Sequence, residues 1–502
     1  MGVVRGFAGL AFAAFLLAGT PARAQVAQGL VLDGVTIVDT RDGSLSRDRA
    51  ILIDRGKIQR IARAGSIAPS GAARRVDMHG KYVVPGYLDM HSHSLSAPDR
   101  DGAFALMLAN GVTGYRQMSG SPELLAQRKK GKPFSADLAP ELLLMPGTIL
   151  TPLNAGTPQA AIAEVDRQKD EGADFIKVID VRPDAFFAVA DEAKKLGLRF
   201  LGHLPPTVNV WDATARGMRS IEHLGPKESI VLGCSTDEDA MRRAIAATPP
   251  KAPQVGLGPG LAAAVERALA NPDMATDPLD FKMMQRSMET FSAAKCRKLA
   301  AAFVRNGTWQ VPTLIRSRTT DIADDPRYRD DPNLVYMPAA TRALWQDLAK
   351  QFPTRIPAET RAMLVRFFTL RLRLVKLFHD AGVPMMAGSD SGGAGQWDIP
   401  GFSLHQEFDL LAEAGLTPLT ILQMTTLDGA RFLGREATMG TVAAGKDADL
   451  VVLDANPIAN ERNLHRIAAV VRGGTLLSRD DLDRLLEKTK ERQVAAALPA
   501  QK

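Results

Sequence analysis

The chain of 502 residues is long enough for one large domain or for two to three domains of ordinary size. Hydrophobic residues make up 45% and charged residues 24%, a balance typical of soluble globular proteins that excludes the disordered, collagenous and multi-spanning membrane classes. The formal net charge of +6 comes from scattered Lys and Arg without a long basic run, so we expect no nucleic-acid partner.

Residues 1–24 predict a secretory signal peptide. Arg5 precedes an apolar run over residues 7–18, and an A-R-A cleavage signal follows at residues 22–24. The apolar run is shorter than the ~20 residues that cross a bilayer, and Thr20 stands where a lipoprotein would need cysteine. We therefore expect a secreted or periplasmic protein with no stable membrane anchor after cleavage.

Two separate parts of the chain together predict one small β-domain. Short apolar runs separated by Gly and Asp turn signals occupy residues 30–84, and a similar pattern returns in "GTVAAGKDADLVVLDANP" and "IAAVVRGGTLL". The most economical arrangement joins these two ends in a composite β-sandwich domain of residues 25–85 and 434–485. It leaves a single large insert between them.

That insert, residues 86–433, alternates eight apolar strand candidates with helical patterns. The strand candidates are "GYLDMHSH", "GVTGYRQM", "ELLLMPGTIL", "DFIKVID", "RFLGHLP", "SIEHLG", "WQVPTLI" and "VPMMAGSDS". Helix-like stretches that end in Gly precede several of them, as in "VDRQKDEGADFIKV". Eight such units predict an α/β fold of the (β/α)8 TIM-barrel type, and the two long insertions around the seventh strand are expected to cap the barrel.

Six chemically distinctive residues stand at or near the carboxyl ends of these strand candidates. They are His91, His93, Lys177, His203, His223 and Asp390. His91 and His93 are two residues apart on one strand, so their side chains share a face. Active sites of barrels lie at the carboxyl ends of the strands, and four imidazoles, a carboxylate and a lysine there are difficult to explain as structural residues. We therefore predict that the six residues form a functional site.

The types and order of these residues resemble the amidohydrolase superfamily, which has H-x-H on strand one, Lys on strand four, His on strands five and six, and Asp on strand eight. The resemblance extends to "VVPGYLDMHSH", "GADFIKV", "AGSDSG" and "GTVAAGKDADLVVLDANP" and covers nearly the whole mature chain. The lysine and the "IEHL" segment look most like the prolidase-like and imidazolonepropionase-related branch, whose members hydrolyse amide bonds.

The resemblance implies two divalent metal ions, with zinc as the expected metal. Lys177, carboxylated by carbon dioxide, would bridge the two ions. The other ligands would divide into His91, His93 and Asp390 for the first ion and His203 and His223 for the second. Two cations that share a water supply hydroxide as the nucleophile, and Asp390 would carry the proton to the leaving nitrogen. An unmodified Lys177 would instead leave a one-metal site.

Three further residues are candidates for substrate binding. Tyr115 and Arg116 lie on the second strand, where an arginine would suit a substrate carboxylate, and His405 follows the eighth strand. For each of them a structural role stays open. The two cysteines, Cys234 and Cys296, are interpreted as incidental thiols or as one optional bridge.

The sequence thus predicts a metal-dependent hydrolase of a linear amide, such as a dipeptide or an N-acyl amino acid, with a small molecule as its partner. Two alternatives stay open: a hydrolase of a cyclic amide, lactone or phosphotriester on the same scaffold, and a non-catalytic metal-binding protein. The proton-carrying Asp390 argues against the latter, because a binding protein has no need of it. The oligomeric state, a homo-oligomer included, is left open.

Overall fold

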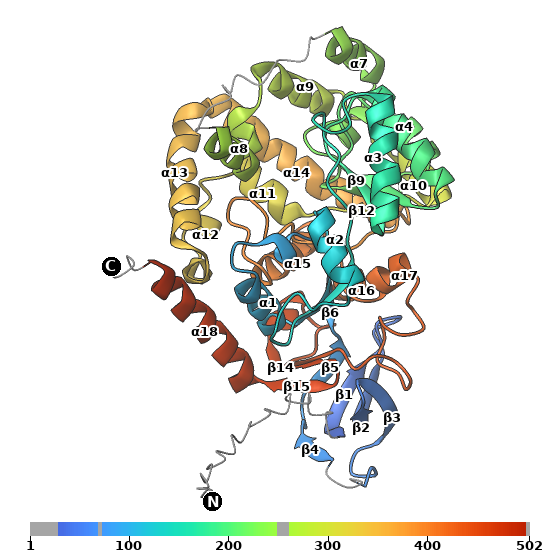
Figure 1. Ribbon diagram of the computed structural model, residues 1–502, viewed down its shortest axis with the longest axis vertical. Coiled ribbons are helices and arrows are strands. Elements are labelled where there is room, and N and C mark those ends of the chain that lie inside the picture. Colours follow the sequence, from blue (N-terminus) through green and yellow to red (C-terminus); the bar gives the residue numbers. More distant parts are fainter. Residues whose placement is uncertain (1–28, 69–72, 248–260, 498–502) are drawn as a thin grey trace, which may run out of the picture.

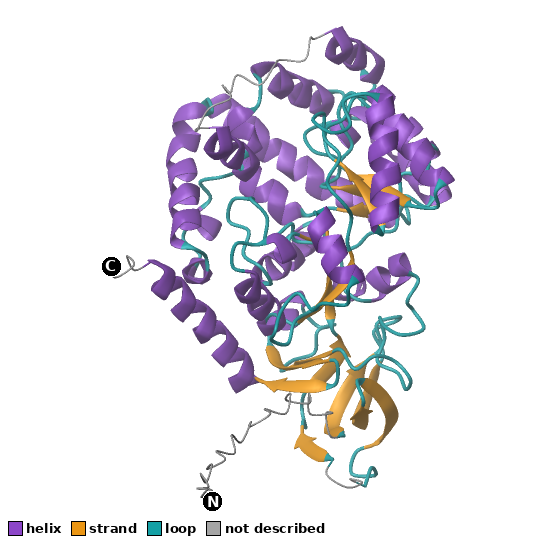
Figure 2. Ribbon diagram, viewed as in Figure 1, coloured by secondary structure: helices purple, strands orange, loops and turns teal. Residues whose placement is uncertain are grey.

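The computed structural model describes residues 29–68, 73–247 and 261–497 (Figure 1). The fold is mixed α/β: helices surround the larger, upper part of the molecule, and a region rich in strands forms its lower end (Figure 2). The signal peptide predicted for residues 1–24 lies outside the described residues. Within the described ranges, no helix has the length and apolar character needed to span a bilayer.

Strands from both ends of the chain form one curled eight-stranded sheet at the lower end. Its order is β15-β14-β13-β5-β1-β2-β3, and β4 pairs with β1. The strands are β1 (Leu30–Val38), β2 (Leu45–Asp54), β3 (Lys57–Arg63), β4 (Arg74–Asp77), β5 (Tyr82–Pro85), β13 (Leu450–Leu453), β14 (Ile467–Arg472) and β15 (Thr475–Ser478). The two ends meet where β5 pairs antiparallel with β13, with Val84 opposite Val451.

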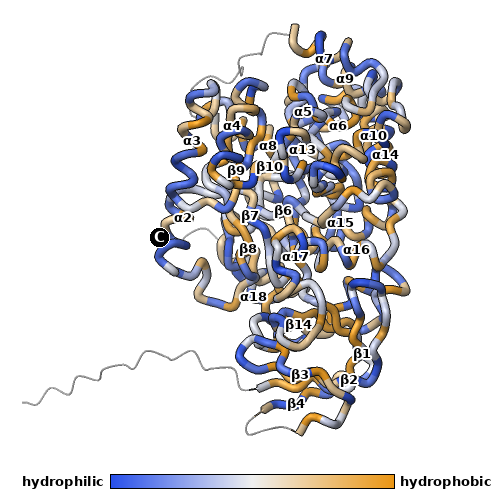
Figure 3. The backbone as a smooth tube through the Cα atoms, turned by 90° about the vertical axis from the view of Figure 1, so that its right-hand side faces the viewer, coloured by the Kyte–Doolittle hydropathy of each residue, from blue (hydrophilic) through white to orange (hydrophobic). Residues whose placement is uncertain are grey.

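Alternating apolar residues hold this sheet together. Leu30, Leu32 and Ile51 from the first segment share one buried cluster with Leu450 and Val452 from the last segment. Side chains two positions apart on a strand point to the same face, so this cluster forms between strands that are about 400 residues apart in the sequence. Figure 3 shows apolar and polar residues interleaved along this part of the chain.

Two parallel sheets follow in the chain. The first has the order β6-β7-β8 and the second the order β12-β11-β10-β9. Their strands are β6 (Tyr87–Ser92), β7 (Val112–Gln117), β8 (Glu141–Leu144), β9 (Phe175–Val178), β10 (Arg199–Gly202), β11 (Ser220–Glu222) and β12 (Trp309–Val311). Seven of the eight strands expected from the sequence are therefore present.

The eighth strand candidate is not a regular strand in the described structure. It makes an isolated parallel bridge between Met385 and Gln310 of β12. Met386 N donates to Gln310 O at 3.0 Å, but Pro384 has no N–H to donate, which limits the ladder on this side. Met90 N of β6 donates to Ala387 O at 3.0 Å, so the segment still connects β12 to β6.

The two parallel sheets enclose a common apolar core. Leu88 and Met90 of β6 belong to the same buried cluster as Phe175 of β9, Leu201 of β10 and Val311 of β12. After β8, Leu150 N donates to Lys177 O at 2.9 Å and links the first sheet to β9. One set of side chains from both sheets is therefore packed together, while others, such as Val112 and Ile176, pack with residues of the surrounding helices.

Helices connect the parallel strands and form the two long insertions. The connecting helices are α1 (Arg100–Ala109), α2 (Pro122–Lys129), α3 (Pro158–Glu171), α4 (Pro183–Lys195) and α5 (Val210–Ala215). The insertion before β12 holds α6 (Ser229–Gly233), α7 (Glu238–Ala247), α8 (Leu261–Ala270), η2 (Pro272–Ala275), α9 (Pro278–Glu289) and α10 (Ala293–Asn306). The insertion after β12 holds α11 (Leu314–Asp321), α12 (Pro326–Arg329), η3 (Pro332–Tyr336), α13 (Ala339–Arg355) and α14 (Ala358–Asp380). Shorter elements complete the fold: η1 (Ser94–Ser96), α15 (Phe402–Glu413), α16 (Pro418–Met424), α17 (Leu427–Leu433) and η4 (Glu461–His465).

A last helix, α18 (Arg479–Ala497), is absent from the sequence-based expectation, which ended the β-domain at residue 485. It runs from the lower sheet along the side of the molecule to α1 (Figure 1), where Gln493 Nε2 donates to Asp99 Oδ2 at 2.7 Å. Its buried positions include Thr489 and Gln493 beside Leu482. Because polar residues fill much of its packed face, the sequence carries little apolar periodicity there.

The two cysteines are joined by a disulfide. Cys234 follows α6 and Cys296 lies in α10, and both side chains are fully buried. The bond links two helices of the first insertion across a sequence separation of 62 residues. It settles the choice between thiols and a bridge that the sequence left open.

Reduction of this disulfide should destabilise the insertion. A closed loop of this size restricts the unfolded chain enough to contribute about 4 kcal/mol. We expect reductant to lower the melting temperature of the wild-type protein and not that of a Cys234→Ala/Cys296→Ala variant, which should already melt at the lower value. Calorimetry with and without reductant measures this, and equal melting temperatures for all four samples would contradict it.

Candidate functional site

Four histidines converge at the carboxyl ends of the parallel strands. His91 is the last residue but one of β6 and His93 directly follows this strand, while His203 comes directly after β10 and His223 directly after β11. The ring centroids of His91 and His223 are 4.7 Å apart, and those of His203 and His223 are 4.8 Å apart. His93 lies 5.6 Å from His91 between ring centroids. Residues that are up to 132 positions apart in the sequence thus form one cluster of imidazoles.

Asp390 and Lys177 complete this cluster. Asp390 Oδ1 lies 2.9 Å from His91 Nε2 and 3.3 Å from His93 Nε2. Lys177, in β9, places Nζ 3.5 Å from His91 Nε2. All six residues that the sequence singled out are therefore brought to one place.

The backbone reaches these positions in unusual conformations. Gly202 has a φ of +129°, and a Cβ atom there would lie 2.3 Å from the carbonyl oxygen of Val178, so only glycine fits directly before His203. His223 and Asp390 are both left-handed, with φ values of 60° and 61°. Such strained conformations cost free energy and concentrate at functional sites, where the surrounding structure holds them.

Burial sets the protonation of the cluster. It lowers the pKa of His93 to about 4 and that of His203 to about 3, so both rings are neutral at pH 7. A neutral imidazole nitrogen is the form that binds a metal ion. Burial also lowers the pKa of Lys177 to about 8, which increases the share of neutral amine.

Part of the cluster meets the geometric requirement for a metal site. Ligand atoms of His91, His223 and Asp390 all lie within 4.8 Å of one another. Two imidazole nitrogens and a carboxylate oxygen are donors that zinc and similar divalent ions accept. The residues therefore fit a metal ion.

A buried ion pair lies directly against this cluster. Glu222, at the end of β11, receives two hydrogen bonds from Arg116 Nη2, at 3.0 and 2.9 Å, and its Oε2 lies 2.7 Å from His91 Nδ1. Although burial opposes ionisation, Arg116 and His91 lower the pKa of Glu222 to about 2. An ionised Glu222 accepts a hydrogen bond from the Nδ1–H group of His91, which leaves Nε2 of that ring without a proton and directed toward Asp390.

Further polar contacts fix the loops that carry the cluster. Asp89 Oδ1 accepts a hydrogen bond from Ser389 N at 3.0 Å, which ties the segment before Asp390 to β6. The Nδ1 atom of His93 lies 2.9 Å from Ser119 Oγ. The Nδ1 atom of His223 is hydrogen-bonded to Thr313 Oγ1. Each of these residues fixes one ring or loop in place.

The sequence analysis did not single out Glu222, Asp89, Ser119 or Thr313, and it named Arg116 only as a candidate for substrate binding with a structural role left open. Their one sequence signal is an acidic or basic residue inside a strand that is otherwise apolar, as with Glu222 in "SIEHL" and Arg116 in "VTGYRQ". Charged residues are rarely fully buried unless they are paired, so two such strands imply a partner for each charge. The pairing itself requires the three-dimensional structure.

The three predicted substrate-binding residues are core residues instead. Arg116 is fully buried: beside Glu222 it donates to Ser220 Oγ at 3.2 Å and to the carbonyl oxygen of Met90. Tyr115 is 1% exposed, and burial raises its pKa well above the usual value. His405 is buried, and its Nε2 lies 2.9 Å from the carbonyl oxygen of Asn110. The structural alternative holds for each of them, because strand and helix-start positions in this fold face the packed interior.

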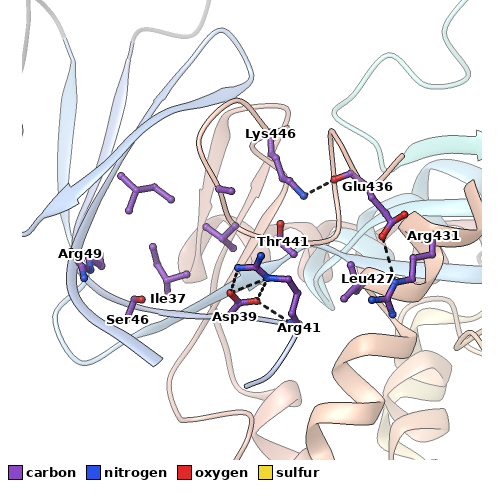
Figure 4. A pocket seen from close by; sticks show the side chains of 13 residues that line it. Ile37, Asp39, Arg41, Ser46, Arg49, Leu427, Arg431, Glu436, Thr441 and Lys446 are labelled. Atoms are coloured by element: carbon purple, nitrogen blue, oxygen red, sulfur yellow. Dashed lines mark hydrogen bonds and ion pairs between the residues drawn. The ribbon is translucent and has the colours of Figure 1, made fainter. Parts of the chain in front are cut away.

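A cavity of about 320 Å³ opens beside the cluster, with His93 and Ser119 in its wall. A larger cavity of about 470 Å³ lies between the lower sheet and α17 (Figure 4). Its charged residues are largely engaged, since Arg41 pairs with Asp39 and Arg431 with Glu436, and it contains no histidine. The smaller cavity is therefore the candidate substrate site despite its size.

Comparison with known proteins agrees with this picture. A model of the Amidohydrolase family matches residues 370–477. An imidazolonepropionase of Saccharopolyspora erythraea is 26% identical over 273 residues, 49% of this chain and 62% of that protein. One of Pseudomonas putida is 36% identical over 69 residues, 14% of this chain and 17% of that protein. The chain thus covers less than two thirds of the length of these curated relatives.

Solved structures share the fold over nearly the whole chain. Bottromycin amidohydrolase is 21% identical with a TM-score of 0.64, and the match covers 94% of this chain and 92% of that one. A Xaa-Pro dipeptidase with bound methionine in its active site is 16% identical with a TM-score of 0.58, and the match covers 90% of this chain and all (100%) of that one. At these identities the likeness establishes a common fold.

Breaking the buried ion pair should be costly. Glu222→Gln leaves Arg116 charged and uncompensated in the interior, and such a change costs about 3 to 5 kcal/mol. The double variant Glu222→Gln/Arg116→Met removes both charges and should recover most of that loss. Urea unfolding of the single and double variants measures the difference, and a single variant as stable as the wild type would contradict the assigned role.

Proposed function

Because the chain belongs to the amidohydrolase superfamily, we propose that it is a metal-dependent hydrolase that cleaves an amide bond. One observation carries the proposal: four histidines, one lysine and one aspartate from five separate segments converge within hydrogen-bond or ring-contact distance. A structural role would leave this convergence unexplained, since isolated core histidines do not gather around one partly exposed carboxylate.

The proposal includes a finer architecture. We propose that the two parallel sheets and residues 384–387 form one closed (β/α)8 barrel, supported by the hydrogen bonds on both sides and by the shared apolar core. The segments 25–85 and 434–485 would form the composite β-sandwich domain, supported by the pairing of β5 with β13. The long insertions would then stand at the same end of the barrel as the cluster.

The six residues would hold two divalent metal ions, with zinc as the expected metal. His91, His93 and Asp390 are proposed for one ion, and His203 and His223 for the other. Lys177 supports the bridge: its amine is 1% exposed, and within the described residues no carboxylate lies within salt-bridge distance of Nζ. Reaction with carbon dioxide would replace an unpaired buried ammonium by a carboxylate that can be shared between ions.

The chain's own residues divide the chemistry between them. When bound, the two cations would polarise the scissile carbonyl and lower the pKa of a water molecule. Asp390 would accept the proton from that water and return it to the leaving nitrogen, because its carboxylate lies at the centre of the cluster. Glu222 would hold His91 in the tautomer that leaves Nε2 free for a ligand bond.

A linear amide, such as a dipeptide or an N-acyl amino acid, is the proposed substrate class. The names of the structural neighbours, an amidohydrolase and a Xaa-Pro dipeptidase, support it. A cyclic amide is the second candidate, favoured by the match to imidazolonepropionases. A secreted or periplasmic location is proposed from residues 1–24, and the disulfide is typical of such compartments.

The substitution Asp390→Asn tests both the activity and the mechanism. Asparagine keeps the size of the side chain and one of its oxygen atoms, but it lacks the carboxylate that carries the proton. Against a panel of dipeptides, N-acyl amino acids, cyclic amides and lactones, we expect the wild type to hydrolyse amides and the variant to lose turnover by a factor on the order of a hundred to ten thousand. The loss should fall on kcat more than on KM, because the interaction develops in the transition state.

The control is an amide with a good leaving group, which needs no proton on departure and should lose less. If the variant hydrolysed a poor-leaving-group amide at the wild-type rate, Asp390 would be only a ligand. If the wild type hydrolysed no member of the panel, the proposed activity itself would be wrong.

A further inference from the structure

The cavity beside His93 is lined by several separate parts of the fold. Its walls come mainly from α1 and the segment before it, from η3, α13 and the segment that joins them, and from the loop of residues 392–394 after Asp390, while α8 and α18 contribute Glu266 and Gln493. Its volume of about 320 Å³ is in the usual range for a pocket that receives part of a small molecule. Because His93 belongs both to its wall and to the cluster, anything bound in it lies next to the reacting atoms.

The wall is predominantly apolar. Its large side chains are Leu106, Tyr336, Met337, Leu344 and Trp345. Tyr336, Met337 and Leu344 are partly exposed and supply accessible apolar surface, whereas Leu106 and Trp345 are each only 1% exposed and belong to the packed interior. Apolar surface of this kind gains free energy when it is covered by an apolar ligand group.

The charges around the cavity are acidic. Asp99 and Glu266 line it, while no Lys or Arg does among the residues that the structure describes. Asp99 is already hydrogen-bonded to Gln493 of α18. Asp99 is also paired with Arg492 Nε at 3.5 Å. An anionic ligand group would therefore find no cation among the described residues that line the cavity, and burial of a bare carboxylate without a partner is costly.

A further cation, Arg316, lies against the other carboxylate oxygen of Asp390. Arg316 Nε is 3.4 Å from Asp390 Oδ2, whereas His93 Nε2 is 3.3 Å from Asp390 Oδ1. The cluster thus has a cationic side at Arg316 and an apolar side at the cavity. A substrate whose two flanking groups differ in charge would be oriented by this asymmetry.

We propose that the cavity is a specificity pocket for a large, uncharged hydrophobic group, aromatic or branched, that flanks the scissile bond of the substrate. The inference rests on the proposed amide hydrolysis and narrows its substrate class. It also assigns a function to the second insertion, since α13 and the segment before it supply most of the large apolar side chains in the wall.

Filling the cavity tests the inference. Thr341 of α13 lines the cavity, and Ala343, two residues along the same helix, is exposed. Thr341→Phe places a ring in the cavity, while Ala343→Phe adds the same ring to the outer surface and is the matched control. The panel consists of amide pairs that differ in one group, acetyl against phenylacetyl on the acyl side and glycine against phenylalanine on the amine side.

In one of the two series, the wild type and Ala343→Phe should prefer the larger group in kcat/KM by roughly tenfold or more, the usual worth of a filled hydrophobic pocket. Thr341→Phe should lose that preference while retaining activity on the smaller member. Leu344→Gln makes the wall polar and should reduce the preference in the same series. This second variant keeps the inference testable if Thr341→Phe does not fold. Equal preference in all four proteins, or none in the wild type, would overturn the inference.

A direct binding measurement distinguishes failure of the pocket assignment from failure of the proposed amide hydrolysis. Phenylpropanamide, a neutral apolar probe, should bind the wild type and Ala343→Phe in calorimetry, and bind Thr341→Phe at least about tenfold more weakly. If no amide is hydrolysed but the probe binds with this pattern, the pocket is correct and the proposed reaction is wrong. If amides are hydrolysed but the probe binds all variants alike, the reaction is correct and the pocket is wrong.

Discussion

The buried ion pair between Glu222 and Arg116 is the interaction on which the site depends. Two charges out of water are tolerated only when each is fully hydrogen-bonded, and here the remaining acceptor capacity of Glu222 is used by His91 and Ser220. The ion pair therefore also orients groups beyond its own two side chains. It sets the tautomer of His91, and through His91 Nε2 it sets the position of Asp390.

The need to hold the cluster around this ion pair also explains the strained backbone conformations next to the site. His223 follows Glu222 directly in a left-handed conformation, and Asp390, also left-handed, donates its backbone N–H to His91 O at 2.7 Å. Both residues project side chains into one space because neighbouring segments hold them there. Asp89 and Ser389 connect these segments in the interior, so the cluster is formed by rigid strand ends and not by independent loops.

Much of the fold and the positions of the six cluster residues follow from local patterns in the sequence. Strands such as β9 and β10 are short apolar runs that start after a helix with a terminal glycine, and residues at their carboxyl ends must meet once the strands are parallel. The pairing of Glu222 with Arg116 did not follow, because it depends on strand register. The buried positions of Tyr115 and His405, and the polar packed face of α18, depend equally on which neighbour covers each surface.

Metal analysis tests most directly the central claim that these residues form one binuclear site. After growth with zinc, the purified wild type should contain about two divalent ions per chain, as two-metal hydrolases do, and His203→Ala should lose roughly one of them. Replacing His379, an imidazole in α14 that is not one of the six cluster residues, should leave the content unchanged. Wild-type protein with no bound transition metal, or a His203→Ala variant that retains the wild-type metal content, would contradict the account.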